Sequence, residues 1–337
     1  MDDVRDELVR SLFTAMEIDE GWSVREPGGF SWWSDRLAQR VSAQALDDGT
    51  MLVHAATDVL RDVPRDPEIG ARLGALNRFA TLSALVHHPD EGRVRYHCAV
   101  AIHPETAPST KPLLLTAMSI QVADAHVKAE VLASLLGGTP DVTEHPHRGP
   151  RPEPDDMIDV IEHGHVPLGR ERSPFTADDF AALRELEANA WAAVEGQGTE
   201  MTCLVSAAPG WPGIARFFAS GSSRHPQLGS GALLRVSLPP EMHPDVHKVA
   251  ASALNTAELA RTSAAHCLGA WCTDPRPELG LTYVTFLPAA THRRGLLVEM
   301  ARSAVIRARW ATKFVRRTQK MTTRGAAAAS GEAKAGA

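Results

Sequence analysis

The spacing of apolar and polar positions predicts one order of elements that the chain contains twice. Between residues 68 and 137, a helix carrying the tripeptide Ala75-Leu76-Asn77 precedes a hairpin formed by strands 81–87 and 93–103. Pro104 ends this hairpin, because proline removes a backbone donor, and a long helix with an apolar stripe follows from about Lys111.

The same order begins again at about residue 245. A helix carrying Ala253-Leu254-Asn255 precedes two predicted strands, 263–273 and 281–287, which flank the turn Asp274-Pro275-Arg276-Pro277. Pro288 ends this second hairpin, and another long helix follows from about Arg293. A repeated order of helix, hairpin, proline and helix indicates an internal duplication.

The segments in front of the two repeats also resemble each other in pattern. In the first half we expect a helix at 4–16, a strand at 31–45, with a partly helical segment as the alternative there, and another strand at 51–59. In the second half we expect a helix that Thr176 and Asp179 cap and that reaches Trp191, and then strands 201–207, 214–219 and 232–238. Each half therefore reads as a helix, about three strands, a helix, a hairpin and a helix. The predicted fold class is α+β, with two tandem domains related by a pseudo-two-fold axis, each an antiparallel sheet with helices packed on one face.

Amino-acid composition predicts where these domains begin and end. Residues 139–175 contain seven prolines and are predicted to be a linker between repeat 1–138 and repeat 176–324. Residues 325–337 consist of small and polar residues with many alanines, and we expect them to form a disordered tail.

This order resembles the type III secretion chaperone-like superfamily, which includes the YbjN-type proteins. The matching residues are Ala75-Leu76-Asn77 and Ala253-Leu254-Asn255, each followed by its hairpin. The resemblance implies small α+β domains that dimerise and bind polypeptides, and it brings no shared catalytic residues. Because this chain carries two copies, one polypeptide would form a pseudo-dimer.

Bulk charge and hydropathy narrow the functional classes. The formal net charge of −6 argues against wholesale nucleic-acid binding, and no apolar run approaches the length of a membrane span. The acidic start Met1-Asp2-Asp3 lacks the apolar core of a signal peptide, so we expect a cytoplasmic protein. The four cysteines are then expected to be reduced and mostly buried.

No motif in the chain predicts catalysis or a cofactor. Gly229-Ser230-Gly231 lacks the flanking residues of a phosphate loop or of a nucleophile elbow, and no catalytic triad can be identified from spacing. Four histidines on or near the first hairpin could converge on a metal, as an alternative to ordinary surface positions: His87, His88, His97 and His103. We expect a protein that is not an enzyme and has no metal or cofactor.

Scarce aromatic residues mark a candidate protein-binding surface, and they are Trp32, Trp33, Trp211, Phe217 and Phe218. Neighbouring residues on a strand point to opposite faces. One member of Trp32/Trp33 and one of Phe217/Phe218 should therefore leave the core face, where it could grip a protein or peptide client.

The last predicted helix is strongly basic and supports an alternative function. Its candidate contacts to an anionic partner are Arg302, Arg309, Arg316 and Arg317, and Glu299 is the one acid between Arg293 and Arg324. The favoured function is a non-catalytic adaptor or chaperone-like module. The alternative is a regulator that binds nucleic acid or another anionic partner through this helix. Further homo-oligomerisation stays open.

Overall fold

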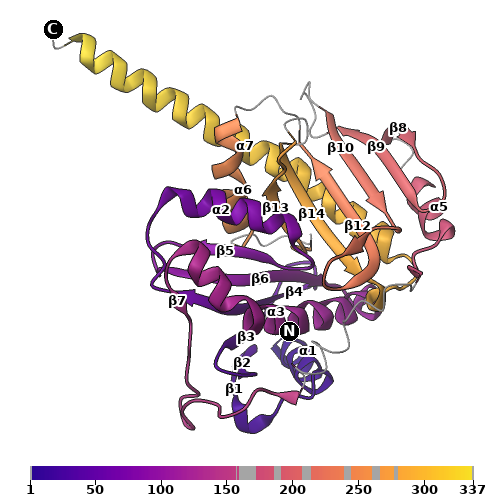
Figure 1. Cartoon of the computed structure of the whole chain (residues 1–337). Helices are drawn as coiled ribbons and strands as arrows, with labels where there is room; N and C mark the ends of the chain where they lie inside the picture. The colour runs from indigo at the N-terminus through magenta and orange to yellow at the C-terminus, as the bar shows by residue number, and fades with distance from the viewer. Residues whose placement is uncertain are drawn as a thin grey trace.

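The chain folds as an α+β protein with two antiparallel sheets and accompanying helices (Figure 1). The computed structural model describes residues 2–156, 158, 172–185, 191–206, 214–238, 244–259, 266–276 and 280–335.

The first half forms a sheet with the strand order β1-β2-β3-β4-β6-β5, and β7 pairs with β4. Its helices and strands are α1 (Asp2–Ala15), β1 (Ser23–Glu26), β2 (Gly29–Trp33), β3 (Ala38–Ala45), β4 (Met51–Arg61), α2 (Pro67–Leu76), β5 (Ala84–His88), β6 (Arg93–Ile102), α3 (Ala107–Leu136) and β7 (Thr139–Pro140). Two short 3-10 helices, η1 (Glu20–Trp22) and η2 (Asn77–Phe79), lie between them.

The second half forms a sheet whose order, read from the matching edge, is β8-β9-β10-β12-β14-β13, and β11 pairs with β12. Its elements are α5 (Ala177–Glu185), β8 (Trp191–Glu195), β9 (Glu200–Ser206), β10 (Ile214–Ser220), β11 (Arg224–His225), β12 (Gly229–Ser237), α6 (Pro244–Leu259), β13 (Ala270–Thr273), β14 (Leu281–Pro288), η3 (Ala289–Thr291) and α7 (Leu296–Ala335). The predicted cap of α5 is present, because the Thr176 backbone N–H donates to the Asp179 carboxylate at 2.8 Å.

Several predicted elements differ from the structure. The single strand expected at 31–45 is wrong, because β2 and β3 are separate antiparallel strands in which Trp32 pairs with Gln39. The turn between them, residues 34–37, has neither glycine nor proline and so lacks the usual sequence signal. Trp191 begins strand β8 and does not belong to the preceding helix. Among the described residues, four strands (β1 to β4) precede the middle helix of the first half and five (β8 to β12, with the two-residue β11) precede that of the second, where about three were expected.

The first part of the predicted linker packs on the first sheet. The Asp141 N–H donates to the Val59 carbonyl at 2.9 Å, and the Asp155 N–H donates to the Ser34 carbonyl at 2.7 Å. Proline is compatible with this segment of the chain. Strand β7 has only two residues, so pairing with β4 requires few backbone N–H donors, and Pro140 lacks one.

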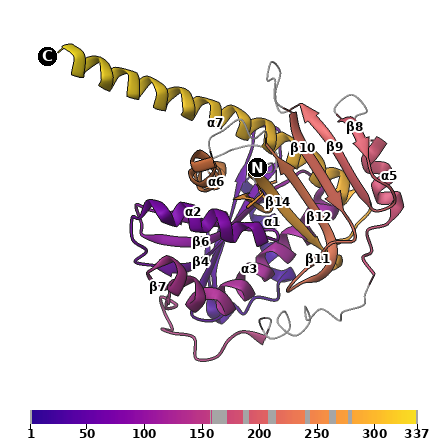
Figure 2. The ribbon, with the colours of Figure 1, turned by 45° about the horizontal axis from the view of Figure 1, so that its top comes forward.

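The predicted disordered tail from residue 325 is also wrong, because α7 continues to Ala335. Alanine has the highest intrinsic helix propensity, and this segment is rich in alanine. The helix extends away from the body of the molecule (Figure 2).

The two asparagines of the repeated tripeptide make the same contacts. The Asn77 side chain donates to the Leu85 carbonyl at 2.9 Å and accepts from the Leu85 N–H at 2.8 Å. Asn255 does the same with Trp271, with both distances at 2.8 Å. Both side chains are buried. Asn77, at the end of α2, therefore holds the second residue of the edge strand β5. Asn255, in the last turns of α6, holds the second residue of the edge strand β13.

The two tyrosines of the chain occupy corresponding places in this arrangement. Tyr96 lies on β6 opposite Leu85, and Tyr283 lies on β14 opposite Trp271. In each sheet, the asparagine-bound residue pairs with a tyrosine. This pair therefore allows the strands of one half to be aligned with those of the other.

Backbone hydrogen bonds join the two halves in a reciprocal way. The Ala99 N–H donates to the Cys267 carbonyl at 3.1 Å, the Cys267 N–H donates to the Ala99 carbonyl at 2.7 Å, and the Phe286 N–H donates to the Thr81 carbonyl at 3.1 Å. Thr81 precedes Leu85 by four positions (85 − 81), as Cys267 precedes Trp271 (271 − 267). Ala99 and Phe286 each lie three positions after a tyrosine (99 − 96 and 286 − 283). Each half therefore extends the edge of the other half's sheet at corresponding positions.

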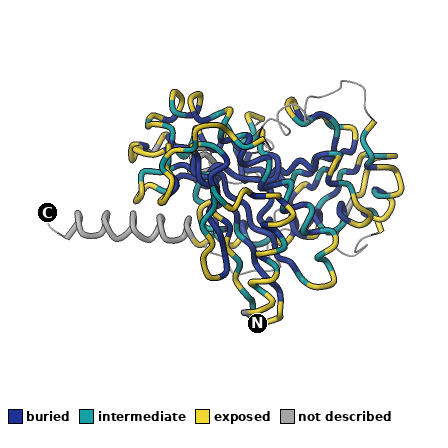
Figure 3. Tube along the Cα trace, turned by 90° about the horizontal axis from the view of Figure 1, so that it is seen from below, coloured by how far each residue is buried: buried dark blue, intermediate teal, exposed yellow. Residues whose placement is uncertain are grey.

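The helices between the halves follow the same reciprocal scheme. Helix α2 packs against α6 and β13, and α6 packs against α2 and β5. A Cβ on Gly70 of α2 would lie 3.4 Å from Ser252 of α6, so the two helices approach closely. Buried apolar residues from both halves belong to one continuous cluster, which Figure 3 shows as the dark blue interior.

We predict that Asn77→Ala and Asn255→Ala each lower the free energy of unfolding by about 2–4 kcal/mol, because each change leaves one buried N–H and one buried carbonyl without a partner. Urea unfolding followed by circular dichroism measures this change. The matched control is Thr256→Ala, which alters an exposed hydroxyl next to Asn255 and should cost less than about 1 kcal/mol. Equal effects of Asn255→Ala and Thr256→Ala would contradict the assigned role of the amide.

Candidate functional site

The structure separates the members of each aromatic pair as strand geometry requires. Trp32 and Phe217 lie in the core, whereas Trp33 and Phe218 point to the opposite faces of their sheets. Trp33 is nevertheless only 8% exposed, because the His145 ring lies 4.9 Å away and covers it. Trp211 lies outside the described residues. Of the other four candidates, Phe218 alone is partly exposed.

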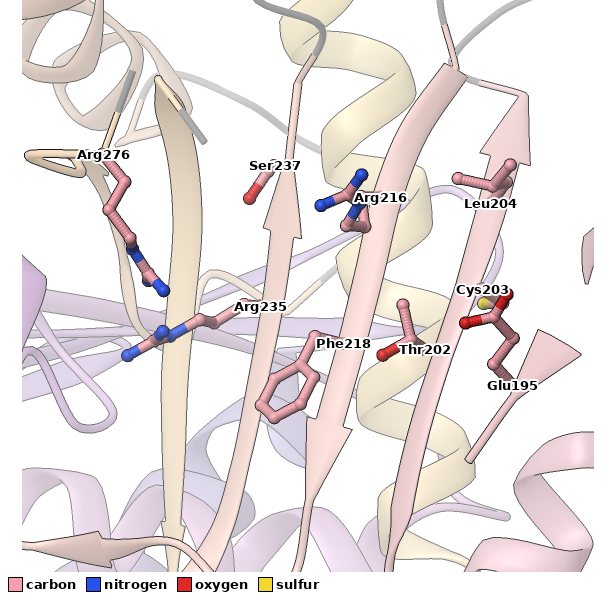
Figure 4. Close-up of a pocket in the computed structure, with 9 residues that line it drawn as sticks. All are labelled: Glu195, Thr202, Cys203, Leu204, Arg216, Phe218, Arg235, Ser237 and Arg276. Carbon is pink, nitrogen blue, oxygen red and sulfur yellow. The ribbon is translucent and has the colours of Figure 1, made fainter. Parts of the chain in front are cut away.

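Phe218 lies in a groove of about 540 Å³ on the second sheet (Figure 4). The lining residues come mainly from strands β8, β9, β10 and β12, and they are Glu195, Thr202, Cys203, Leu204, Arg216, Phe218, Arg235, Ser237 and Arg276. Figure 4 shows α7 behind the strands, so the groove lies on the face that the helix leaves uncovered.

Strand register arranges the groove in two rows across three strands. Phe218 on β10 pairs with Thr202 on β9 and with Arg235 on β12. Arg216 pairs in the same way with Leu204 and Ser237. Each row therefore combines an apolar side chain, a guanidinium and a hydroxyl on one face of the sheet.

Positive charge in this groove is only partly compensated. Arg216 is exposed and Arg235 is half-buried, and neither makes an ion pair or hydrogen bond with any residue that the structure describes. Arg276 forms hydrogen bonds with both oxygens of Asp274, each at 2.9 Å. Burial lowers the pKa of Arg235 and the nearby charge of Arg276 lowers it further, while the carboxylate of Asp274 acts in the opposite direction. The groove can thus accept anionic groups together with apolar ones.

The corresponding face of the first sheet is neutralised internally. The Asp58 carboxylate on β4 is fully buried and forms ion pairs with Arg40, with Arg93 at 3.3 Å and with Arg95 at 2.5 Å. Arg93 also contacts Asp141 at 2.6 Å. The three arginines of this face therefore already hold carboxylates from the chain itself.

The four predicted arginines of the last helix lie on α7. Arg302 and Arg317 are exposed, whereas Arg309 and Arg316 are half-buried. A further basic residue of this helix, Arg307, has a different role from its neighbours.

Arg307 is 1% exposed and binds Glu258 of α6 through two nitrogens, one of them at 2.9 Å. Its guanidinium also lies 4.0 Å from the centre of the Tyr283 ring and donates to the Leu268 carbonyl at 3.1 Å. Glu258 additionally accepts from the Trp271 indole at 3.1 Å. Burial by itself lowers the pKa of Arg307, but the attraction of Glu258 and Tyr283 together with the hydrogen bonds to Glu258 raises it above the ordinary value. This residue fixes α7 to α6 and β14, and it is not part of a solvent-facing basic surface.

The hairpin histidines form no metal centre with other described residues. His54 and His97 have ring centroids 5.4 Å apart, and burial lowers the pKa of His97 to about 3, so its imidazole is neutral near pH 7. His103 lies beyond the end of β6. Among the residues described, no three His, Cys, Asp or Glu side chains are grouped as metal ligands.

The four cysteines are free and buried, and burial raises the pKa of Cys98, Cys203 and Cys272 to about 12. These thiols are therefore protonated and unreactive near neutral pH. Within the described part of the chain, no helix combines the length and apolar character that crossing a membrane requires.

Sequence reasoning found Phe218 but missed the arginines around it. Arg216 and Arg235 alternate with buried residues in β10 and β12, which is typical of any strand with one solvent-facing side. Only the sheet order, which places β10 beside β12, brings the two arginines together.

Comparisons of the chain with protein-family models, with curated proteins and with solved structures find no match.

We predict that Arg307→Met lowers the free energy of unfolding by about 3–5 kcal/mol, because it leaves the Glu258 carboxylate buried without its charged partner. The double variant Arg307→Met/Glu258→Gln should recover part of this loss, since it buries no unpaired charge. Thermal and urea unfolding of the single and double variants measures both effects. Arg302→Met is the matched control on the exposed side of the same helix. A loss for Arg302→Met equal to that of Arg307→Met would contradict this assignment.

Proposed function

We propose that this chain is a non-catalytic protein-binding adaptor, chaperone-like in character, whose two halves act as the two subunits of an intrachain pseudo-dimer. The observation that carries the proposal is the reciprocal pairing of Thr81 with Phe286 and of Cys267 with Ala99. In a two-fold symmetric dimer, a contact between positions i and j occurs twice, once in each direction. The paired bonds have this form within one chain.

Further contacts support a pseudo-two-fold relation between the halves. The asparagine amides bind corresponding edge-strand residues, the strand orders correspond, and α2 and α6 each pack against the other half. The predicted kinship with the type III secretion chaperone-like superfamily agrees with such a pairing, since its members dimerise and bind polypeptides. We place the adaptor in the cytoplasm.

The client-binding surface is proposed to be the open groove of the second sheet. Its aromatic residue Phe218 is accessible, whereas Trp33 in the first half is covered. An aromatic anchor beside arginines has the composition of many protein-binding hot spots. The duplicated frame would thus present one site per chain.

Proteins captured from the native cell by the full chain, by Phe218→Ala and by Arg302→Ala can be compared by mass spectrometry. Each candidate client is then produced separately and titrated into the purified chain by calorimetry. We expect a client that binds one per chain, with affinity reduced about tenfold or more by Phe218→Ala and unchanged by Arg302→Ala. The absence of any client that binds the purified chain, or equal affinity for Phe218→Ala, would contradict the proposal.

The same variants address the alternative function in which α7 binds nucleic acid or another anionic partner. Arg302 and Arg317 are exposed on this helix, which favours such a contact. If α7 is the binding element, Arg302→Ala lowers retention on duplex DNA in a salt-dependent manner while Phe218→Ala leaves it unchanged.

A further inference from the structure

The tyrosine register identifies the residue of the second sheet that corresponds to Asp58. Arg95 directly precedes Tyr96 and pairs across β4 and β6 with Asp58. Thr282 directly precedes Tyr283 and pairs across β12 and β14 with Ser237. Ser237 therefore occupies the position at which the first sheet carries its buried carboxylate.

With Ser237 at this position, Arg216 and Arg235 form no ion pair or hydrogen bond with a described carboxylate, although the charge of Asp274 also attracts Arg235. Arg216 lies directly across from Ser237, and Arg235 lies two positions before it on the same face of β12. Asp274 already binds Arg276. Glu195, the one acid among the described lining residues, is exposed on β8, and Figure 4 shows it on the far side of the groove from Arg235.

The first sheet shows what arginines on this face of the fold bind when the anion is present. Three guanidiniums surround one carboxylate there, and charge-assisted hydrogen bonds of this type are among the stronger polar contacts in proteins. The face around Ser237 offers guanidiniums and hydroxyls but no carboxylate between Arg216 and Arg235.

We propose that the groove around Ser237 binds the carboxylates of an extended acidic segment of a client protein, which take the place that Asp58 occupies in the first half. This inference rests on the proposed adaptor function and names the chemistry of the partner. Each row of the groove pairs a guanidinium with an apolar side chain, Arg235 with Phe218 and Arg216 with Leu204. A segment in which acidic and apolar side chains alternate matches both rows.

Introducing a carboxylate at residue 237 by substitution tests the proposal. The probe is a short fluorescein-labelled peptide of alternating leucine and glutamate, with the leucine–glutamine peptide as its matched control, and binding to the full chain is followed by fluorescence anisotropy. Ser237→Asp should weaken binding of the glutamate peptide about tenfold or more, since its own carboxylate competes for the arginines. Ser237→Asn is the control of similar shape to aspartate and no charge, and it should weaken binding clearly less than Ser237→Asp does.

Removal of the cations tests the same site independently. Arg216→Gln and Arg235→Gln should each weaken the glutamate peptide about tenfold and leave the glutamine peptide unchanged. Circular dichroism and the melting temperature establish that each variant is folded. Ser237→Asp should melt at or above the wild-type temperature, because the new carboxylate compensates the arginines.

Several outcomes would overturn the inference without touching the adaptor proposal. Equal binding of the two peptides, unchanged binding by Ser237→Asp, or no binding of either peptide would each exclude an acidic segment as the occupant. Displacement of the peptide by inorganic phosphate, stronger than by chloride at the same ionic strength, would assign the groove to phosphate instead. A native client that binds Ser237→Asp as tightly as the wild type would show that its carboxylates do not occupy the site around Ser237.

Discussion

Unsatisfied strand edges are the constraint on which this structure depends. Strand β6 runs to Ile102, but its neighbour β5 covers it only from Arg93 to His97. Beyond His97, backbone N–H and carbonyl groups along this edge of β6 would have no partners within the first half. Burying a backbone group without a hydrogen-bond partner costs free energy. The segment at Cys267 from the other half supplies those partners, and Thr81 does so for β14.

This mutual dependence makes the two halves one folding unit. Helices α2 and α6 lie against each other beside the shared edges, and apolar residues of both halves form one buried cluster. In the proposed pseudo-dimer, pairing of the halves would not depend on protein concentration, as pairing of separate chains would. Because the halves are joined, they can differ in function. On the face of the first sheet, Asp58 forms ion pairs with arginines. On the second sheet, Ser237 stands at the corresponding position and supplies no carboxylate to Arg216 and Arg235.

Much of the frame could be predicted from local pattern, because its signals are local. The asparagine tripeptides, both hairpins and the alternation at Trp32/Trp33 and Phe217/Phe218 follow from periodicity and from proline positions. The turn at 34–37 and strand β8 lack strong turn or strand signals. The partners of Arg307 and Asp58, and the closeness of Arg216 to Arg235, could not be predicted, because these arrangements join strands or helices that are separate in the chain. A basic residue in a helix looks alike in sequence whether it is exposed, as Arg302 is, or pairs with Glu258 in the core.

Cleavage of the chain between its halves tests the shared-edge arrangement most directly. A protease site inserted between residues 165 and 166 would be cut in the purified, folded protein, and the product analysed by size-exclusion chromatography with light scattering and by thermal unfolding. If the halves complete each other's sheets, the two fragments co-elute at the mass of the intact chain and unfold in one cooperative transition. Separation into two folded fragments with independent transitions would contradict it.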